Sequence, residues 1–123
     1  LVLGMGAAAR YALMVGARNA SARAHRLARV TRERFATIPG VRGLDRGERL
    51  SAITTYTVEG HVARDLVLAL RAQGINTSAQ SRGDALIDLD RKGAATLLRV
   101  SPHYYNNDYE LDKLNSALTR LLA

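Results

Sequence analysis

The feature that most constrains the fold is a proline-free stretch over residues 5–37 that is rich in alanine and arginine. Apolar and small side chains recur along it at spacings of three and four residues, which is the period of one face of an α-helix. The members of this face are Leu13, Ala17, Ala20, Ala24, Leu27, Thr31, Phe35 and Ile38. Pro39 and Gly40 interrupt the pattern. The sequence therefore predicts one long amphipathic helix that ends before Pro39.

The positive charge of the chain is concentrated in the same region. The net charge is +7, and residues 1–49 carry ten arginines against three acidic residues, whereas residues 50–123 are balanced. The remaining faces of the expected helix carry Arg18, Arg23, Arg26, Arg29 and Arg32. Such a surface is either a nucleic-acid-binding face or a solvated face whose arginine stems cover apolar neighbours. We favour the solvated face and expect no nucleic-acid partner, because no DNA-binding motif accompanies the charge.

The rest of the chain alternates between strand and helix patterns. Residues 51–59 and 95–101 are rich in β-branched or alternating apolar side chains and are predicted strands. Residues 62–73 form a predicted helix that ends at Gly74, with Val62, Leu66, Ala69 and Leu70 facing inward. Residues 41–49 are expected to be a loop or an edge strand, 75–78 a short strand, 79–84 a polar loop, and 85–89 a brief strand or turn.

The last helix has a clear start signal. Asn107 stands three residues before Glu110, the spacing of a capping box, and Leu111, Leu114, Leu118 and Leu121 follow as a buried stripe. The expected fold is a two-layer α/β (α+β) domain, with a small mixed sheet and helices on one face. We expect residues 1–40 to be a connecting helix and residues 41–123 to be a small α/β domain.

Several kinds of site are absent from the sequence. There is no cysteine, which removes disulfides, cysteine-ligated metals and thiol nucleophiles. No glycine-rich phosphate loop occurs, and the three histidines fall in different expected elements. The apolar run at the start is interrupted by Arg10 and Tyr11 and is too short to span a membrane, so no membrane partner is expected. Because the first residue is Leu1, we expect the chain to begin inside a longer protein.

Arg99 is the strongest candidate for a binding residue. It lies in a predicted strand whose neighbours are mostly apolar, with Leu98 and Val100 on one face and Leu97, Arg99 and Ser101 on the other. A guanidinium in such surroundings needs a partner. The partner is either a carboxylate of the same fold or an anionic ligand held by the arginine fork.

A longer pattern around Arg99 resembles a known family. Arg99-Val100-Ser101, then Tyr105-Asn106 and the acidic helix start Glu110-Leu111-Asp112, is similar to the C-terminal signature of class V aminotransferase-type enzymes. This family includes cysteine desulfurases, selenocysteine lyases and isopenicillin-N-epimerase-like proteins. The resemblance extends over nearly the whole chain, through the long helix ending at residues 38–41 and the helix ending at residues 70–75.

The resemblance implies a function for the chain as part of a larger enzyme. It would be the C-terminal small domain of a cytoplasmic, dimeric pyridoxal-phosphate enzyme, joined to an upstream large domain that carries the Schiff-base lysine. Lys92 and Lys113 are the only lysines here and do not match that lysine, so the segment alone is expected to be inactive and to bind no cofactor. Without the large domain, the alternative is a basic nucleic-acid-binding or a non-catalytic interaction domain.

The resemblance also implies roles for individual residues. Arg99 matches the arginine that binds the substrate carboxylate, while Ser101, Tyr105 and Asn106 are expected to act locally in strand termination, packing and helix entry. The segment 78–82 matches an active-site loop, in which Gln80 and Arg82 are further candidates for substrate contact. Desulfurases carry a sulfur-accepting cysteine in that loop. Its absence argues against a sulfur-carrying desulfurase and leaves lyase, epimerase-like and aminotransferase-like reactions of an amino acid open.

Overall fold

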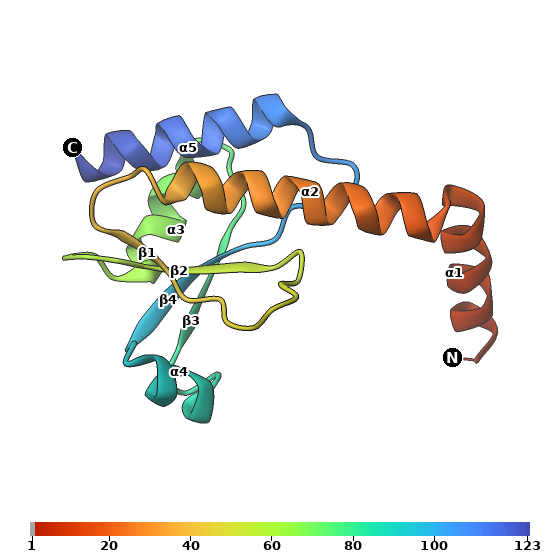
Figure 1. Cartoon of the computed structure of the whole chain (residues 1–123), viewed down its shortest axis with the longest axis horizontal. Helices are drawn as coiled ribbons and strands as arrows, with labels where there is room; N and C mark the ends of the chain where they lie inside the picture. Colours follow the sequence, from red (N-terminus) through yellow and green to blue (C-terminus); the bar gives the residue numbers. More distant parts are fainter. Residues whose placement is uncertain (1) are drawn as a thin grey trace.

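The computed structural model describes residues 2–123 as five helices and four strands. In chain order they are α1 (Val2–Val15), α2 (Ala17–Phe35), β1 (Val41–Gly43), β2 (Thr54–Val58), α3 (Ala63–Ala72), β3 (Ser78–Ser81), α4 (Leu86–Lys92), β4 (Thr96–Val100) and α5 (Asp108–Leu122) (Figure 1). None of these helices is long and apolar enough to cross a membrane.

The four strands form one sheet in the order β1-β2-β4-β3. Every neighbouring pair is antiparallel. The sequence predicted a mixed sheet, and this part of the prediction was wrong. In this register Arg99 of β4 lies between Thr55 of β2 and Ser78 of β3. Because side chains alternate along a strand, residues paired in this way share one face of the sheet.

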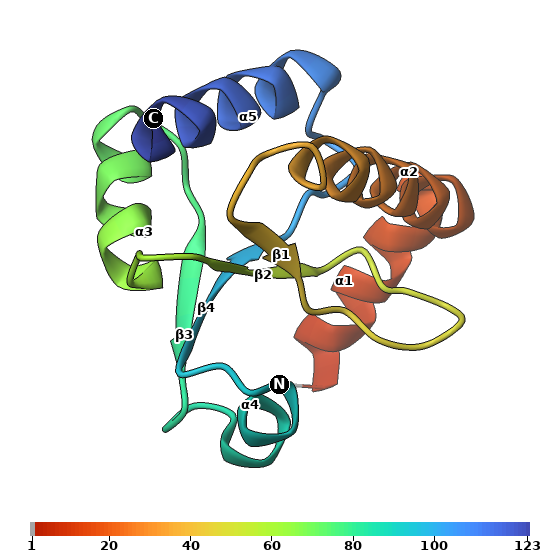
Figure 2. The same ribbon diagram turned by 60° about the vertical axis from the view of Figure 1, so that its left-hand side comes forward.

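The main hydrophobic core covers one face of the sheet. Helices α2, α3 and α5 lie against this face (Figure 2) and contribute Phe35, Leu70 and Leu118, all 1% exposed or less. They meet Tyr56 and Leu98 of the sheet, and the rings of Phe35 and Tyr56 lie 4.6 Å apart. Burial raises the pKa of Tyr56 to about 12. The predicted two-layer α/β architecture, with the three predicted helices on one face, is therefore confirmed.

The opposite face of the sheet carries only a small apolar cluster. Leu97 of β4 packs there with Leu44, Leu89 and Ala94, so α4 covers one end of this face. The alternation predicted for β4 is confirmed, because Leu98 and Val100 belong to the main core and Leu97 to the second cluster.

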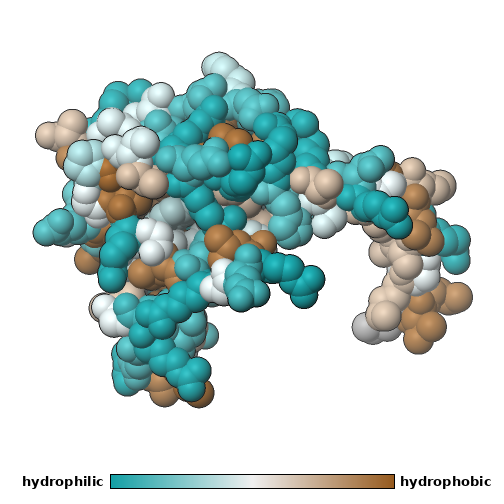
Figure 3. Space-filling model, in the orientation of Figure 1, coloured by the Kyte–Doolittle hydropathy of each residue, from teal (hydrophilic) through white to brown (hydrophobic). Residues whose placement is uncertain are grey.

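The predicted long helix is broken at Gly16. This residue adopts a left-handed backbone conformation (φ 89°, ψ 75°) that glycine reaches without steric cost. Helix α1 consequently bends off the line of α2 (Figure 1) and has no buried residue, and Leu13, expected on the inner face, is 74% exposed. Figure 3 shows α1 as a largely apolar arm beside the body of the domain. The expectation of one continuous helix over residues 5–37 was wrong at this point.

Three smaller predictions also require correction. The segment 78–81, expected to enter a loop, is the edge strand β3, because its backbone pairs with β4. The segment expected as a brief strand or turn at 85–89 opens helix α4, which ends at Gly93 in a left-handed conformation. Val62 is 53% exposed rather than inward-facing, since α3 buries Ala63, Leu66, Val67 and Leu70 instead.

Candidate substrate-binding site

Arg99 lies on the sheet face that the three core helices leave uncovered. Its neighbours Leu98 and Val100 point into the main core, so its half-buried side chain points the other way. Its Nε donates a hydrogen bond to Ser101 Oγ at 3.1 Å. None of the ion pairs among residues 2–123 involves Arg99. Of the two kinds of partner considered for this arginine, the carboxylate of the same fold is not present in the described chain.

Gln80 and Arg82, the other two candidates, have different surroundings. Gln80 is the cross-strand partner of Leu97 and therefore shares the sheet face of Arg99. Arg82 follows β3 and forms a bidentate ion pair with Asp90 of α4, with its Nε 2.6 Å from Oδ1 and its Nη2 2.8 Å from Oδ2. This pairing raises the pKa of Arg82. Gln80 therefore lies on the same sheet face as Arg99, whereas the guanidinium of Arg82 is already paired with Asp90.

Thr55, the other cross-strand neighbour of Arg99, is held by a network that the sequence did not reveal. Asp45 accepts hydrogen bonds from the backbone N of Thr55 at 3.0 Å and from its Oγ1 at 2.7 Å. The same carboxylate pairs with Nε of Arg32 at 2.7 Å, with side chains only 20% and 16% exposed. Arg32 also donates to the carbonyls of Ser51 and Ile53. Helix α2 is thereby fixed to the strand beside Arg99.

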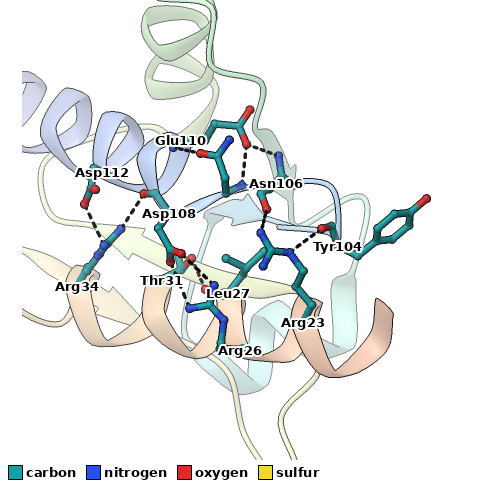
Figure 4. Close-up of polar contacts among 11 residues, drawn as sticks. Arg23, Arg26, Leu27, Thr31, Arg34, Tyr104, Asn106, Asp108, Glu110 and Asp112 are labelled. Carbon is teal, nitrogen blue, oxygen red and sulfur yellow. Dashed lines mark hydrogen bonds and ion pairs between the residues drawn. The ribbon is translucent and has the colours of Figure 1, made fainter. Parts of the chain in front are cut away.

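The segment that follows β4 is held by Arg23 of α2. Its Nε donates to the carbonyl of Tyr104 and its Nη2 to that of Asn106, both at 2.8 Å (Figure 4). Asn106 in turn accepts a hydrogen bond from the backbone N of His103. Residues 101–106, which include Ser101, Tyr105 and Asn106 of the pattern that resembles the family, therefore follow a fixed path. Helix α2, about eighty residues earlier in the chain, holds them in place.

The start of α5 is fixed by α2 in the same way (Figure 4). Arg26 pairs with Asp108 at 3.0 Å and Arg34 with Asp112 at 2.9 Å. The hydrogen bond from Arg26 lowers the pKa of Asp108. Of the five arginines expected on the open faces of α2, four have partners within the chain: Arg23, Arg26, Arg29 and Arg32. The basic surface considered for nucleic acid is therefore largely occupied by intramolecular contacts.

The predicted capping box at the start of α5 is confirmed. Asn107 Oδ1 accepts from the backbone N of Glu110 at 3.0 Å, and Glu110 Oε2 accepts from the backbone N of Asn107 at 3.0 Å. The bond from the backbone N of Asn107 to Glu110 Oε2, together with a second from Nδ2 of Asn106, lowers the pKa of Glu110. The cap sets where α5 begins and so where the turn after β4 ends.

A groove of about 450 Å³ adjoins the end of β4. Its wall is formed by the connection between α3 and β3, the end of β4 and the first turns of α5. The polar side chains at its surface include Asn76, Thr77, Ser101 and Lys113. Ser101 thus contacts Arg99 on one side and faces open space on the other.

Comparison with known proteins identifies the family of this chain. The model of the class V aminotransferases matches residues 1–114. The chain belongs to this family. A probable cysteine desulfurase of Mycolicibacterium paratuberculosis is 29% identical over 119 residues, which is 97% of this chain and 17% of the relative. The chain therefore spans less than a fifth of that relative's length.

Solved structures show the same fold. A cysteine desulfurase of Thermococcus onnurineus superposes with a TM-score of 0.84 at 20% identity, over 92% of this chain and 28% of that one. A cysteine desulfurase of Escherichia coli superposes with a TM-score of 0.75 at 26% identity, over 83% of this chain and 25% of that one. Pyridoxal phosphate is the cofactor of this family.

The two lysines of this chain lie in different surroundings. Lys92, at the end of α4, is paired with Asp88 at 2.7 Å and is only 12% exposed. Lys113 lies on the exposed side of α5. Neither lysine is a cross-strand neighbour of Arg99 in the sheet.

Proposed function

We propose that this chain is the C-terminal part of a pyridoxal-phosphate enzyme that acts on an amino acid, in which Arg99 binds the substrate carboxylate. The observation that carries the proposal is that the guanidinium of Arg99 has no carboxylate partner in the described chain. Its one side-chain hydrogen bond there goes to Ser101. A charge held on a sheet face without an internal partner suits an external anion. The fork of arginine matches a carboxylate bidentately.

Fixing the carboxylate would orient the rest of the substrate. A reacting bond must be held in one geometry relative to the group that acts on it, and a two-point ion pair supplies that constraint. Gln80 shares the face of Arg99 and is proposed as a second contact. Arg82 was also a candidate, and a role in binding would require it to leave Asp90.

The proposal extends to the organisation of the whole protein. Residues 1–40 would lead from an upstream large domain into a small domain of residues 41–123, in a cytoplasmic homodimer. The reaction would be of the lyase, epimerase-like or aminotransferase-like kind. It would not pass sulfur through a cysteine at residues 78–82, because that segment is Ser-Ala-Gln-Ser-Arg and forms an edge strand and its exit.

The test is to replace Arg99 in the enzyme that contains this chain. Arg99→Ala should raise KM for an amino-acid substrate about 10- to 150-fold, which corresponds to the loss of one charge-assisted contact. KM for the matching amine without a carboxylate should change little, and the visible absorbance of the bound cofactor should persist. Arg99→Lys should give an intermediate loss, because lysine keeps the charge without the fork.

Arg42→Ala is the matched control. Arg42 lies on the same sheet face, and its Nε donates weakly to Thr57 at 3.5 Å. The substitution Arg42→Ala removes one positive charge from this face, as Arg99→Ala does, but leaves Arg99 in place. An equal rise in KM in both variants, or none in Arg99→Ala, would show that Arg99 does not bind the carboxylate.

A further inference from the structure

The hydrogen bond between Arg99 and Ser101 restricts how Arg99 can receive a ligand. A guanidinium presents five N–H donors in a planar fork, one on Nε and two on each terminal nitrogen. Here the Nε donor is used by Ser101 Oγ at 3.1 Å. A carboxylate that pairs side-on would need Nε and one terminal nitrogen, whereas an end-on carboxylate pairs with the two terminal nitrogens. Because Nε is already used, only the end-on arrangement remains open to a carboxylate ligand.

Ser101 is well placed to impose this orientation. It stands two residues after Arg99, so both side chains fall on the same side of the extended chain. The next residue, Pro102, is buried and has a restricted backbone. Two residues further on, Arg23 holds the carbonyl of Tyr104. The hydroxyl that accepts from Arg99 is thus attached to a fixed point of the backbone.

We propose that Ser101 is a positioning residue, which holds Nε of Arg99 so that the two terminal nitrogens are presented together to the carboxylate of an α-amino acid. This inference rests on the proposed function of Arg99. It assigns Ser101 a role in orienting the guanidinium, beyond the strand termination expected from the sequence. Without the hydroxyl, Arg99 keeps its charge but gains freedom to rotate, and binding the carboxylate must then order it.

The experiment compares Ser101→Ala with Ser116→Ala in the cofactor-loaded enzyme. Ser116 is an exposed serine of α5, away from the sheet face of Arg99, and its hydroxyl makes no hydrogen bond to that guanidinium within residues 2–123. The first readout is exchange of the Arg99 Nε proton with water, measured by NMR on enzyme with ¹⁵N-labelled arginine and assigned through Arg99→Lys. The second is KM and kcat for the amino acid.

We expect Ser101→Ala to speed exchange of the Nε proton and to raise KM about 2- to 10-fold with kcat nearly unchanged, the size of one ordinary hydrogen bond. Ser116→Ala should alter neither readout. Ser101→Thr should restore both, and Ser101→Val, which has nearly the shape of threonine without its hydroxyl, should behave like Ser101→Ala. The Thr and Val pair keeps the test valid if the alanine variant does not fold.

Three results would overturn the positioning role. Unchanged KM in Ser101→Ala and Ser101→Val, with a raised KM in Arg99→Ala, would leave Arg99 as the carboxylate site and remove Ser101 from it. Equal KM values for Thr and Val at position 101 would show that the hydroxyl is not the operative group. If Arg99→Ala itself leaves KM unchanged, the proposed function fails, and the inference for Ser101 fails with it.

Discussion

The two faces of the sheet differ in which groups their side chains contact. On one face, Leu98 and Val100 of β4 are enclosed by three helices of the same chain. On the other, Arg99 lies between Thr55 and Ser78, and no acidic side chain of residues 2–123 forms an ion pair with it. One strand of five residues therefore serves packing and polar presentation at alternate positions. Changes at Leu98 and Val100 should therefore affect stability, and a change at Arg99 should affect binding.

The largest expected effect is on the packed face. Leu98 is fully buried, and Leu98→Ala should lower the free energy of unfolding by about 2–5 kcal/mol through lost burial and an unfilled cavity. Replacement of the next residue, Arg99→Ala, should change the free energy of unfolding by no more than about 0.5 kcal/mol. Urea unfolding followed by circular dichroism measures both. A destabilisation by Arg99→Ala comparable to that of Leu98→Ala would end the distinction between the two faces.

An intermediate effect is expected at Asp45, which connects the two sides. Its carboxylate joins Arg32 of the core-side helix α2 to Thr55 beside Arg99. Asp45→Ala leaves a largely buried guanidinium and a backbone N–H without this acceptor, and should cost about 1–3 kcal/mol of unfolding free energy.

The matched control for Asp45 is Glu33→Ala, which breaks the exposed pair with Arg29, where both side chains are more than half exposed. Its cost should stay below about 1 kcal/mol, because exposed pairs contribute little. The same urea titrations apply. If the two variants were equally stable, the network around Asp45 would not be what fixes α2 to the sheet.

The smallest effect is expected in acid, at the seam between α2 and α5 above the packed face. The folded-state pKa values of Asp108 and Glu110 are lowered, by Arg26 and by the cap respectively. The unfolded chain therefore takes up protons first as the pH falls. Stability should be constant above about pH 5 and should decrease below it, as the pH passes from the ordinary carboxyl pKa through the lowered values.

Thermal unfolding between pH 7 and pH 3 measures this dependence. Arg26→Gln removes the main cause of the lowered pKa of Asp108 and should flatten the decrease. Arg29→Gln, on the same helix but paired with Glu33, should leave the Asp108 contribution in place. A pH profile that is identical in Arg26→Gln and the parent chain would contradict this assignment.

The parts of the fold that sequence reasoning predicted are those with local signals. The start of α5 was predicted because Asn107 and Glu110 satisfy each other three residues apart. The facing of Leu98 and Arg99 was predicted because alternation is intrinsic to a strand. Arg99 was identified as a charge that needs a partner because its neighbours are apolar, whereas its role in binding a carboxylate was expected only from the resemblance to the class V aminotransferases.

The parts that were missed depend on distant or backbone partners. Arg23 binds the carbonyls of Tyr104 and Asn106, and carbonyl groups are the same in every residue, so the sequence carries no sign of that contact. The strand at 78–81 lacks β-branched residues and exists because β4 offers it a partner. The break at Gly16 has no proline to announce it, and glycine is also tolerated inside helices.

The edges of the sheet have a consequence for how the chain behaves at high concentration. The outer strands, β1 and β3, are three and four residues long and carry Arg42 and two serines at exposed positions. A short, polar edge offers few backbone groups and little apolar surface to an incoming strand. The sheet is thereby protected against the strand-by-strand growth that leads to aggregation.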